Sequence, residues 1–294
     1  MKLKLIFNNF ASIANHNSFD KNKPTVMYIH GYIENENFPT VKKIVKVFRE
    51  RNDHNILVCD WGDYSINLYF SVVMPKLKKI GEKISNKLKE FFDAGYNVEK
   101  FYLVGHSLGA QASGLIGRRL KSIYGIELER ITGLDPAQPG FYPPIYKDFQ
   151  AISSSDAKFV DIIHTSSTLG VLKSTGTADF YPNANYLTMP GCEIFNPICN
   201  HQMSVYYFAE SVRKPEIFLA IKADNYEDIE NVNADHAETA LMGFGCSKNA
   251  SVKYYLQLDD EEPYGQGRDG IFIEEEDEDD NEEDFFSSLL SIFY

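Results

Sequence analysis

The sequence predicts an α/β fold in which a mostly parallel central sheet carries helices on both faces. Short apolar runs at residues 25–29, 56–59 and 101–104 suit buried strands, and longer amphipathic patterns lie between them. This alternation of strand and helix is typical of parallel sheets, because a helix returns the chain to the edge at which the next strand begins. With 294 residues, 44% of them hydrophobic, the chain is long enough for one large domain.

The expected elements follow in order along the chain. The pattern predicts strands at 2–7, 25–29, 56–59, 101–104, 130–134 and 159–163, a loop at 8–22, and helices around 41–48, from Ser71 to near Gly95, and from Ala110. A connection rich in Gly, Ser and Thr is expected to lead through residues 179–183 to Cys192. This order places several polar side chains directly after strands.

The most informative stretch is GHSLG at residues 105–109. An apolar strand enters it and a helix of small residues leaves it, which is the setting of a nucleophile elbow. Ser107 would then adopt a strained backbone conformation, with flanking glycines that let strand and helix approach each other. The alternative is a glycine-rich helix start, but the preceding strand favours Ser107 as a nucleophile.

A second informative site follows the strand at 25–29. In α/β hydrolases, a backbone N–H just after such a His30-Gly31 pair donates to the oxyanion, and the residue after the nucleophile supplies the other donor. The expected donors are therefore the amides of Tyr32 and Leu108. A plain strand-to-loop turn is the alternative for the glycine.

Asp135 follows the strand at 130–134 and precedes a proline. Ligands and catalytic groups gather at the carboxyl edge of open α/β sheets, so Asp135 is placed to orient a histidine. The alternative is a turn or helix-capping aspartate. Its position after the serine elbow favours the catalytic interpretation.

Seven histidines compete for the role of general base. Five precede the aspartate or lie in a polar stretch without a strand end: His16, His30, His54, His106 and His236. His164 ends a strand, and His201 is expected on a loop just before a helical pattern; both follow Asp135, as the order serine, aspartate, histidine requires. The residues alone favour His201 but leave His164 open.

Four cysteines are present. Cys192 and Cys199 lie in a stretch with prolines and a glycine, where a short disulfide loop would indicate an oxidising compartment; four reduced cysteines are the alternative. Cys59 and Cys246 are left either paired or free. No C-x-x-C pair is present, so zinc is not expected, and the N-terminus lacks the apolar core of a signal peptide.

The net charge of −13 argues against nucleic acid as a partner, and no run of 18 apolar residues predicts a transmembrane segment. Much of the charge is local, because ten of the eleven residues from Glu274 to Asp284 are acidic. We therefore expect one domain at 1–270 and an acidic, disordered tail at 271–294.

The sequence resembles the pancreatic lipase family, and most of all its insect neutral lipase and phospholipase A1 members. The matching stretches are YIHGY (28–32), DWG (60–62), GHSLGAQASG (105–114), GLDPAQPGFY (133–142), DIIHT (161–165), ADFYPN (178–183), PGC (190–192) and CNH (199–201). They extend from the first strands to about residue 260. The family's separate C-terminal lipid-binding β-sandwich is not expected, because too few residues follow His201.

This resemblance implies an α/β-hydrolase fold, a catalytic triad of Ser107, Asp135 and His201, and a secreted serine esterase that acts on lipid esters at a membrane, micelle or droplet surface. The family normally covers its site with a lid between two cysteines, but Cys192 and Cys199 enclose only six residues. Within the family, such short lids are typical of phospholipase A1. A triacylglycerol or galactolipid lipase is the second choice.

The triad chemistry would need no metal and no organic cofactor. A different class of protein remains as the competing hypothesis, because one fold can serve many functions. The yolk proteins resemble these lipases but lack the nucleophile, and they store or bind lipid. The presence of all three triad residues here favours an enzyme over such a silent lipid-binding protein.

Overall fold

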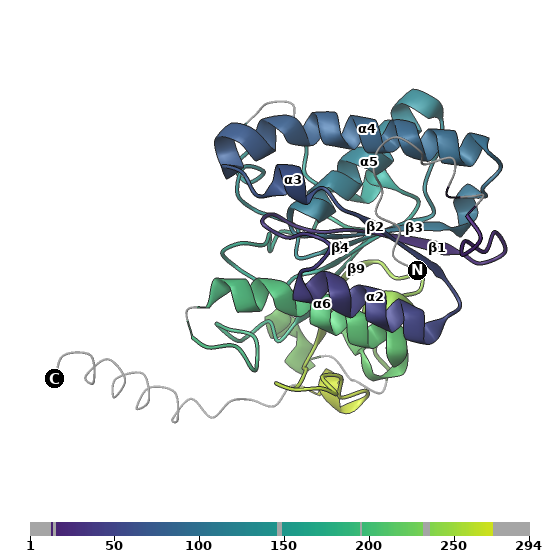
Figure 1. Ribbon diagram of the computed structural model, residues 1–294. Helices are drawn as coiled ribbons and strands as arrows, with labels where there is room; N and C mark the ends of the chain where they lie inside the picture. The colour runs from purple at the N-terminus through teal and green to yellow at the C-terminus, as the bar shows by residue number, and fades with distance from the viewer. Residues whose placement is uncertain (1–12, 14–15, 146–148, 195, 232–235, 273–294) are drawn as a thin grey trace.

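A computed structural model of the protein describes residues 13, 16–145, 149–194, 196–231 and 236–272. These residues form three layers, with a twisted sheet between two layers of helices (Figure 1). Helices α4 (Met74–Asp93) and α5 (Leu108–Tyr124) cover one face, where the short α3 (Gly62–Ser65) also lies. Helices α2 (Pro39–Arg51) and α6 (Pro197–Arg213) cover the other. The predicted fold class is therefore confirmed.

The sheet has nine strands among the described residues, in the spatial order β2-β1-β3-β4-β5-β6-β9-β7-β8. Their bounds are β1 Thr25–Ile29, β2 Asn55–Cys59, β3 Phe101–His106, β4 Arg130–Leu134, β5 Val160–Ile163, β6 Ala178–Pro182, β7 Leu219–Lys222, β8 Thr239–Leu241 and β9 Val252–Leu256. The strands from β2 to β9 in this order pair in parallel, and β7 pairs antiparallel with both of its neighbours, β9 and β8.

The register of the parallel strands brings the polar residues that follow them to one edge. Ile29 of β1 pairs with Gly105 of β3, and Gly105 pairs with Gly133 of β4. The three strands therefore end within one or two residues of one another. Ser107 and Asp135 leave the sheet at this carboxyl edge, as we expected from the sequence pattern.

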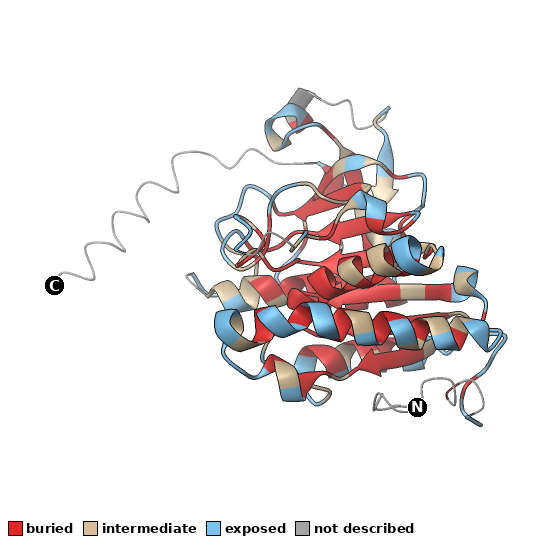
Figure 2. Ribbon diagram, turned by 90° about the horizontal axis from the view of Figure 1, so that it is seen from above, coloured by how far each residue is buried: buried red, intermediate tan, exposed pale blue. Residues whose placement is uncertain are grey.

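Helix α4 buries one apolar face, as its spacing predicts. On α4 the buried residues Leu77, Ile80, Ile84, Leu88 and Phe91 recur every three or four positions and face the sheet. Figure 2 shows the same pattern, with buried strands and helices that are exposed on one side only. In the described part of the chain, no helix is both long enough and apolar enough to cross a membrane.

Residues 179–183 correct the sequence prediction. They were expected in a connection, but 178–182 form β6, a fully buried strand between β5 and β9. Asp179 and Pro182 interrupt the apolar pattern that would have revealed a strand. The Asp179 carboxylate is tolerated in the core because it accepts hydrogen bonds from the Ser174 hydroxyl (2.7 Å) and the Gly176 amide (3.0 Å).

Two other predictions lie wholly or mostly outside the described residues. They concern the strand at 2–7 and the acidic tail at 271–294, of which only Ile271 and Phe272 are described. The helix expected from Ser71 begins with a π-helical segment at Tyr69–Val73 and continues as α4. The division into a domain at 1–270 and a tail stays a prediction.

Candidate active site

Ser107 stands at a sharp turn between β3 and α5. Its φ of 55° and ψ of −121° lie in a region that side-chain-bearing residues rarely adopt, at a cost of about 1–3 kcal/mol. The turn is held because the Ser107 amide donates to the Leu134 carbonyl (2.9 Å) and the Ser107 carbonyl accepts from the Ala137 amide (3.2 Å). This is the strained geometry that the motif predicts for a nucleophile elbow.

The flanking glycines explain how the strand and helix can approach so closely. A Cβ on Gly105 would lie 2.3 Å from the Gly109 carbonyl oxygen, and one on Gly109 would lie 2.1 Å from the Ile29 carbonyl oxygen. Any side chain at either position would push α5 away from the sheet. The Gly-x-Ser-x-Gly pattern is therefore a steric requirement of this turn.

Asp135 and His201 form a buried pair at the same edge of the sheet. Nδ1 of His201 lies 2.5 Å from Oδ2 of Asp135, whose side chain is fully buried. The other carboxylate oxygen accepts the backbone amides of Thr165 (2.8 Å) and Ser166 (3.2 Å). With Nδ1 as the donor to Asp135, the ring nitrogen Nε2 of His201 is left as the basic one.

The sequence suggested that His201 lies on a loop, but the structure places it on a helix. It lies within the first two turns of α6, which begins at Pro197 and is capped by the Asn196 side chain accepting the Cys199 amide (3.0 Å). The disulfide between Cys192 and Cys199, whose Cα atoms are 5.7 Å apart, ties the start of this helix to the preceding loop. His201 is thus carried by a helix whose start is anchored by a disulfide, rather than by a loop.

His106, the residue before Ser107, packs against His201. The two imidazole rings have centroids 4.7 Å apart. Among the described residues no hydrogen bond joins the Ser107 hydroxyl to His201, an arrangement common in free enzymes, where such contacts tighten when substrate binds. Both residues are only slightly exposed, at 8% each.

His164, the alternative base, has both ring nitrogens engaged elsewhere. Nε2 lies 2.8 Å from Oδ1 of Asp179, Nδ1 contacts the Val171 carbonyl, and the ring stacks on Tyr181. The side chain is fully buried. His201 rather than His164 is therefore the partner of Asp135.

The turn after β1 packs directly on the elbow. A Cβ on Gly31 would lie 2.9 Å from the Cβ of Ser107. In the described residues, the amides of Tyr32 and Leu108 donate to no other protein group, so both remain available to a substrate oxygen. His30 has a local role, as expected, because its Nε2 accepts the Trp61 amide (3.2 Å).

Gly170 is a site residue that the sequence did not reveal. A Cβ at this position would lie 2.2 Å from both carboxylate oxygens of Asp135. Gly170 sits in a connection that is rich in Gly, Ser and Thr, so nothing in its local sequence sets it apart. Its importance comes from Asp135, which is distant in the chain.

Replacing Gly170 with alanine is expected to lower kcat for ester hydrolysis about 100-fold, because the methyl group displaces the carboxylate that orients His201. The measurement is kcat on a water-soluble ester. The control is Gly95→Ala, where the added methyl group meets no atom within 4 Å and the positive φ of 94° carries only a conformational cost. Equal activities of the two variants would remove Gly170 from the site.

The remaining cysteines, Cys59 and Cys246, are buried and unpaired. This settles the alternative that the sequence had left between a second disulfide and free thiols. Burial raises the pKa of the Cys59 thiol to about 12, and the nearby Asp60 carboxylate adds to the effect. A thiol in this state is a poor nucleophile, so Cys59 is a packing residue.

The fold and this edge of the sheet define an α/β hydrolase with a serine at its nucleophile elbow. A family model described as Lipase matches residues 2–264, which is most of the chain. The chain belongs to this family, the pancreatic lipase family, as its sequence motifs predicted.

Three curated relatives show how far the similarity extends. Lipase member H of Oryctolagus cuniculus is 33% identical over 233 residues, which cover 75% of this chain and 50% of the relative. Pancreatic triacylglycerol lipase of Cavia porcellus is 30% identical, covering 88% and 61%. Phospholipase A1 2 of Vespa affinis is 32% identical, covering 86% and 79%. The chain thus spans about half the length of Lipase member H and more of the wasp protein.

Proposed function

We propose that this protein is a serine esterase that hydrolyses acyl esters of lipids, with Ser107, Asp135 and His201 as its triad. The observation that carries the proposal is the pairing of His201 with the buried Asp135 at 2.5 Å, on the sheet edge where strained Ser107 emerges. Membership of the Lipase family supports the same conclusion.

In the proposed mechanism, Nε2 of His201 removes the proton of Ser107 as its oxygen attacks the acyl carbonyl. Asp135 holds the Nδ1–H tautomer and stabilises the imidazolium that forms. The amides of Tyr32 and Leu108 donate to the oxyanion, at about 3–4 kcal/mol of transition-state stabilisation for each donor. His201 then protonates the leaving alcohol, and water repeats the sequence on the acyl-enzyme.

Exposed apolar side chains around this edge support a lipid substrate. They lie on segments that follow the strands or open α6: Ile33, Ile66, Leu68, Phe70, Leu172, Leu187, Ile194 and Ile198. Such a concentration of exposed large apolar groups is typical of a surface that meets lipid or another partner. We infer that the substrate is presented at a membrane, micelle or droplet surface.

Two aromatic rings beside the elbow, those of Tyr32 and Tyr69, support acyl-chain binding. The ring of Tyr32 packs edge-on against Tyr69 at 4.9 Å, and the Tyr69 hydroxyl donates to the Pro139 carbonyl (2.9 Å). These two rings therefore connect the proposed oxyanion turn to the segment after Asp135. An acyl chain leaving the reacting carbonyl would meet apolar ring surface here.

Phospholipase A1 activity is the more specific proposal. Cys192 and Cys199 lie only seven positions apart in the sequence, so little chain is available between them to screen the nucleophile from a polar head group. The wasp relative named as a phospholipase A1 matches over 79% of its own length. A triacylglycerol lipase is the second candidate, favoured by the similarity to the Cavia porcellus protein.

The test is fatty-acid release from a phosphatidylcholine that carries different labels at its two acyl positions, with triolein as the neutral comparison. We expect release from the first position, and none after Ser107→Ala. Release from triolein alone would favour the triacylglycerol lipase. No release from either lipid, by a folded protein, would favour a silent lipid-binding protein.

We also propose that the protein is secreted. The Cys192–Cys199 disulfide fits an oxidising compartment, where such bonds persist. Recovery of the native protein from the medium of its own cells, with these two cysteines oxidised, would support the proposal. Recovery only from the cytosol with both thiols reduced would contradict it.

A further inference from the structure

Glu34 is a buried carboxylate in the turn that carries the proposed oxyanion donor Tyr32. Its side chain is 4% exposed. Oε2 accepts the Gly31 amide (2.7 Å), and Oε1 accepts the Thr40 hydroxyl (3.2 Å). The Gly31 amide, which donates to Glu34, immediately precedes the Tyr32 amide, which is proposed to contact the substrate. A buried carboxylate is costly unless it is hydrogen-bonded and paired with a charge.

The partner of Glu34 is His106, whose ring lies between Glu34 and the helix of the catalytic base. Nδ1 of His106 is 3.2 Å from Oε1 of Glu34, an ion-pair distance without the alignment of a hydrogen bond. Nε2 of His106 is 3.2 Å from the backbone carbonyl oxygen of His201. A chain of contacts thus runs from the oxyanion turn, through the residue beside the nucleophile, to α6.

The contacts of His106 indicate its protonation state. Both of its nitrogens face oxygen atoms that can only accept hydrogen bonds, a carboxylate and a carbonyl. A neutral imidazole carries one N–H and would turn a lone pair towards one of them. Only the imidazolium has no lone pair near either oxygen, so the contacts favour a protonated His106 at ion-pair distance from an ionised Glu34.

The electrostatics agree with this geometry. Burial alone would raise the pKa of Glu34, but the charge of His106 and the bond from Gly31 lower it to about 2. Burial would lower the pKa of His106, but the Glu34 carboxylate offsets this and raises it above its ordinary value. The other titratable groups that face the pair are His201 on α6, Asp135 after β4, His30 after β1, Tyr28 on β1 and Tyr206 on α6.

We propose that Glu34 and His106 are positioning residues of this active site, and that their charged pair keeps the oxyanion turn and the helix of His201 in place around Ser107. The pair acts through the backbone of the groups that meet substrate and does not touch substrate itself. This inference rests on the proposed function. It assigns roles to two residues that lie outside the triad and the oxyanion donors.

A pH dependence follows from the proposal. Because the pKa of folded His106 is raised, its stabilising contribution is present at low pH and is lost as the pH rises through that value. Activity should therefore fall at alkaline pH, when His106 loses its proton. The alkaline limb of the pH profile would therefore report on His106.

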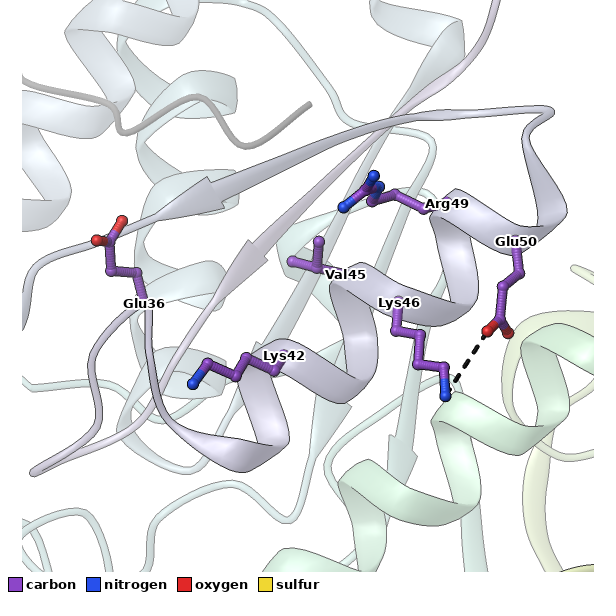
Figure 3. A pocket seen from close by; sticks show the side chains of 6 residues that line it. All are labelled: Glu36, Lys42, Val45, Lys46, Arg49 and Glu50. Atoms are coloured by element: carbon purple, nitrogen blue, oxygen red, sulfur yellow. Dashed lines mark ion pairs between the residues drawn. The ribbon is translucent and has the colours of Figure 1, made fainter.

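The first test compares Glu34→Gln with Glu36→Gln on a water-soluble ester, p-nitrophenyl butyrate. The control carries the same substitution at Glu36, two positions further along the chain. Glu36 is half-buried and lines a surface groove of about 490 Å³ along α2 (Figure 3). We expect Glu34→Gln to lower kcat about 100-fold with KM within about 2-fold, because a displaced oxyanion donor weakens only the transition state. The Glu36→Gln variant should match wild type within about 2-fold.

The second test is the pH profile of kcat/KM. In His106→Gln we expect a lower plateau without the alkaline limb, because the titrating group is gone. A purely structural role would lower the profile without changing its shape. An unchanged alkaline limb in His106→Gln, or a Glu34→Gln variant with wild-type kcat, would overturn the proposal.

A third measurement does not depend on activity. In ¹⁵N-histidine-labelled protein, the ring signals of His106, assigned by their loss in His106→Gln, should be those of an imidazolium at neutral pH. A neutral His106 at pH 7 would overturn the proposal even if Glu34→Gln fails to fold. If wild type hydrolyses no ester while His106 is an imidazolium, the proposed function fails and the charged pair stands.

Discussion

Ser107→Ala is expected to lower the hydrolysis of phospholipid and of soluble esters by about 10⁴-fold or more, since it removes the nucleophile. This corresponds to about 5.5 kcal/mol of transition-state stabilisation. Folding should survive, because alanine keeps the backbone bonds from the Ser107 amide and carbonyl. The measurement is kcat/KM on both substrates, together with Tm.

The matched control is Ser113→Ala on the same helix. The Ser113 hydroxyl is buried and donates to the Gly109 carbonyl (2.9 Å), so it has a packing role and no access to substrate. We expect its kcat to stay within about 2-fold of wild type. If Ser107→Ala retained more than about a tenth of the activity while Ser113→Ala lost it, the elbow would not hold the nucleophile.

Asp135→Asn is expected to lower kcat by about 10⁴-fold, because an amide at this position no longer fixes the His201 tautomer with its basic nitrogen free for Ser107. The amides of Thr165 and Ser166 should continue to hold the side chain in place. The geometry of the site should therefore remain, while the chemistry is lost. The measurement is kcat on p-nitrophenyl butyrate.

Asp179→Asn is the control for this variant, since it alters a second buried Asp–His contact, the 2.8 Å pair with His164. We expect it to lower Tm but to leave kcat within about 3-fold of wild type, because the ring nitrogens of His164 contact Val171 and Asp179 rather than Asp135. If Asp179→Asn abolished activity in a folded protein and Asp135→Asn did not, the base would be His164 rather than His201.

The elbow was predictable because most of its pattern is local. Gly105, Ser107 and Gly109 lie within residues 105–109, and a Cβ on Gly105 would meet Gly109 of the same segment. Gly109 itself is limited by Ile29 at the end of β1. The strands at 25–29, 101–104 and 130–134 were predictable for a similar reason, since continuous apolar runs suit buried parallel strands. A parallel sheet then brings the residues after those strands to one edge.

The helix under His201 was missed although its signals are present. Asn196 followed by Pro197 is a helix-start pattern, with a capping side chain and a proline in the first turn. The prolines and glycine around Cys192 and Cys199 made the whole stretch resemble a loop. The structure shows that the disulfide joins a loop to a helix, so His201 is positioned more firmly than expected.

Gly170 and Glu34 could not be predicted because their partners are distant in the sequence. Gly170 matters only because the Asp135 carboxylate lies against it, and Glu34 only because His106 folds back over it. Strand β6 was missed because its charged residue, Asp179, is compensated by groups outside the strand. In each case a tertiary contact overrides a local pattern.

The most direct test of the central claim is the site of reaction with a fluorophosphonate, which modifies activated serines whatever ester the enzyme prefers. Mass spectrometry of the digested protein should find one adduct, on Ser107, with none in Ser107→Ala and slow formation in Asp135→Asn. An unmodified Ser107 in folded wild-type protein, or an adduct on another serine, would contradict the assignment of Ser107 as the nucleophile.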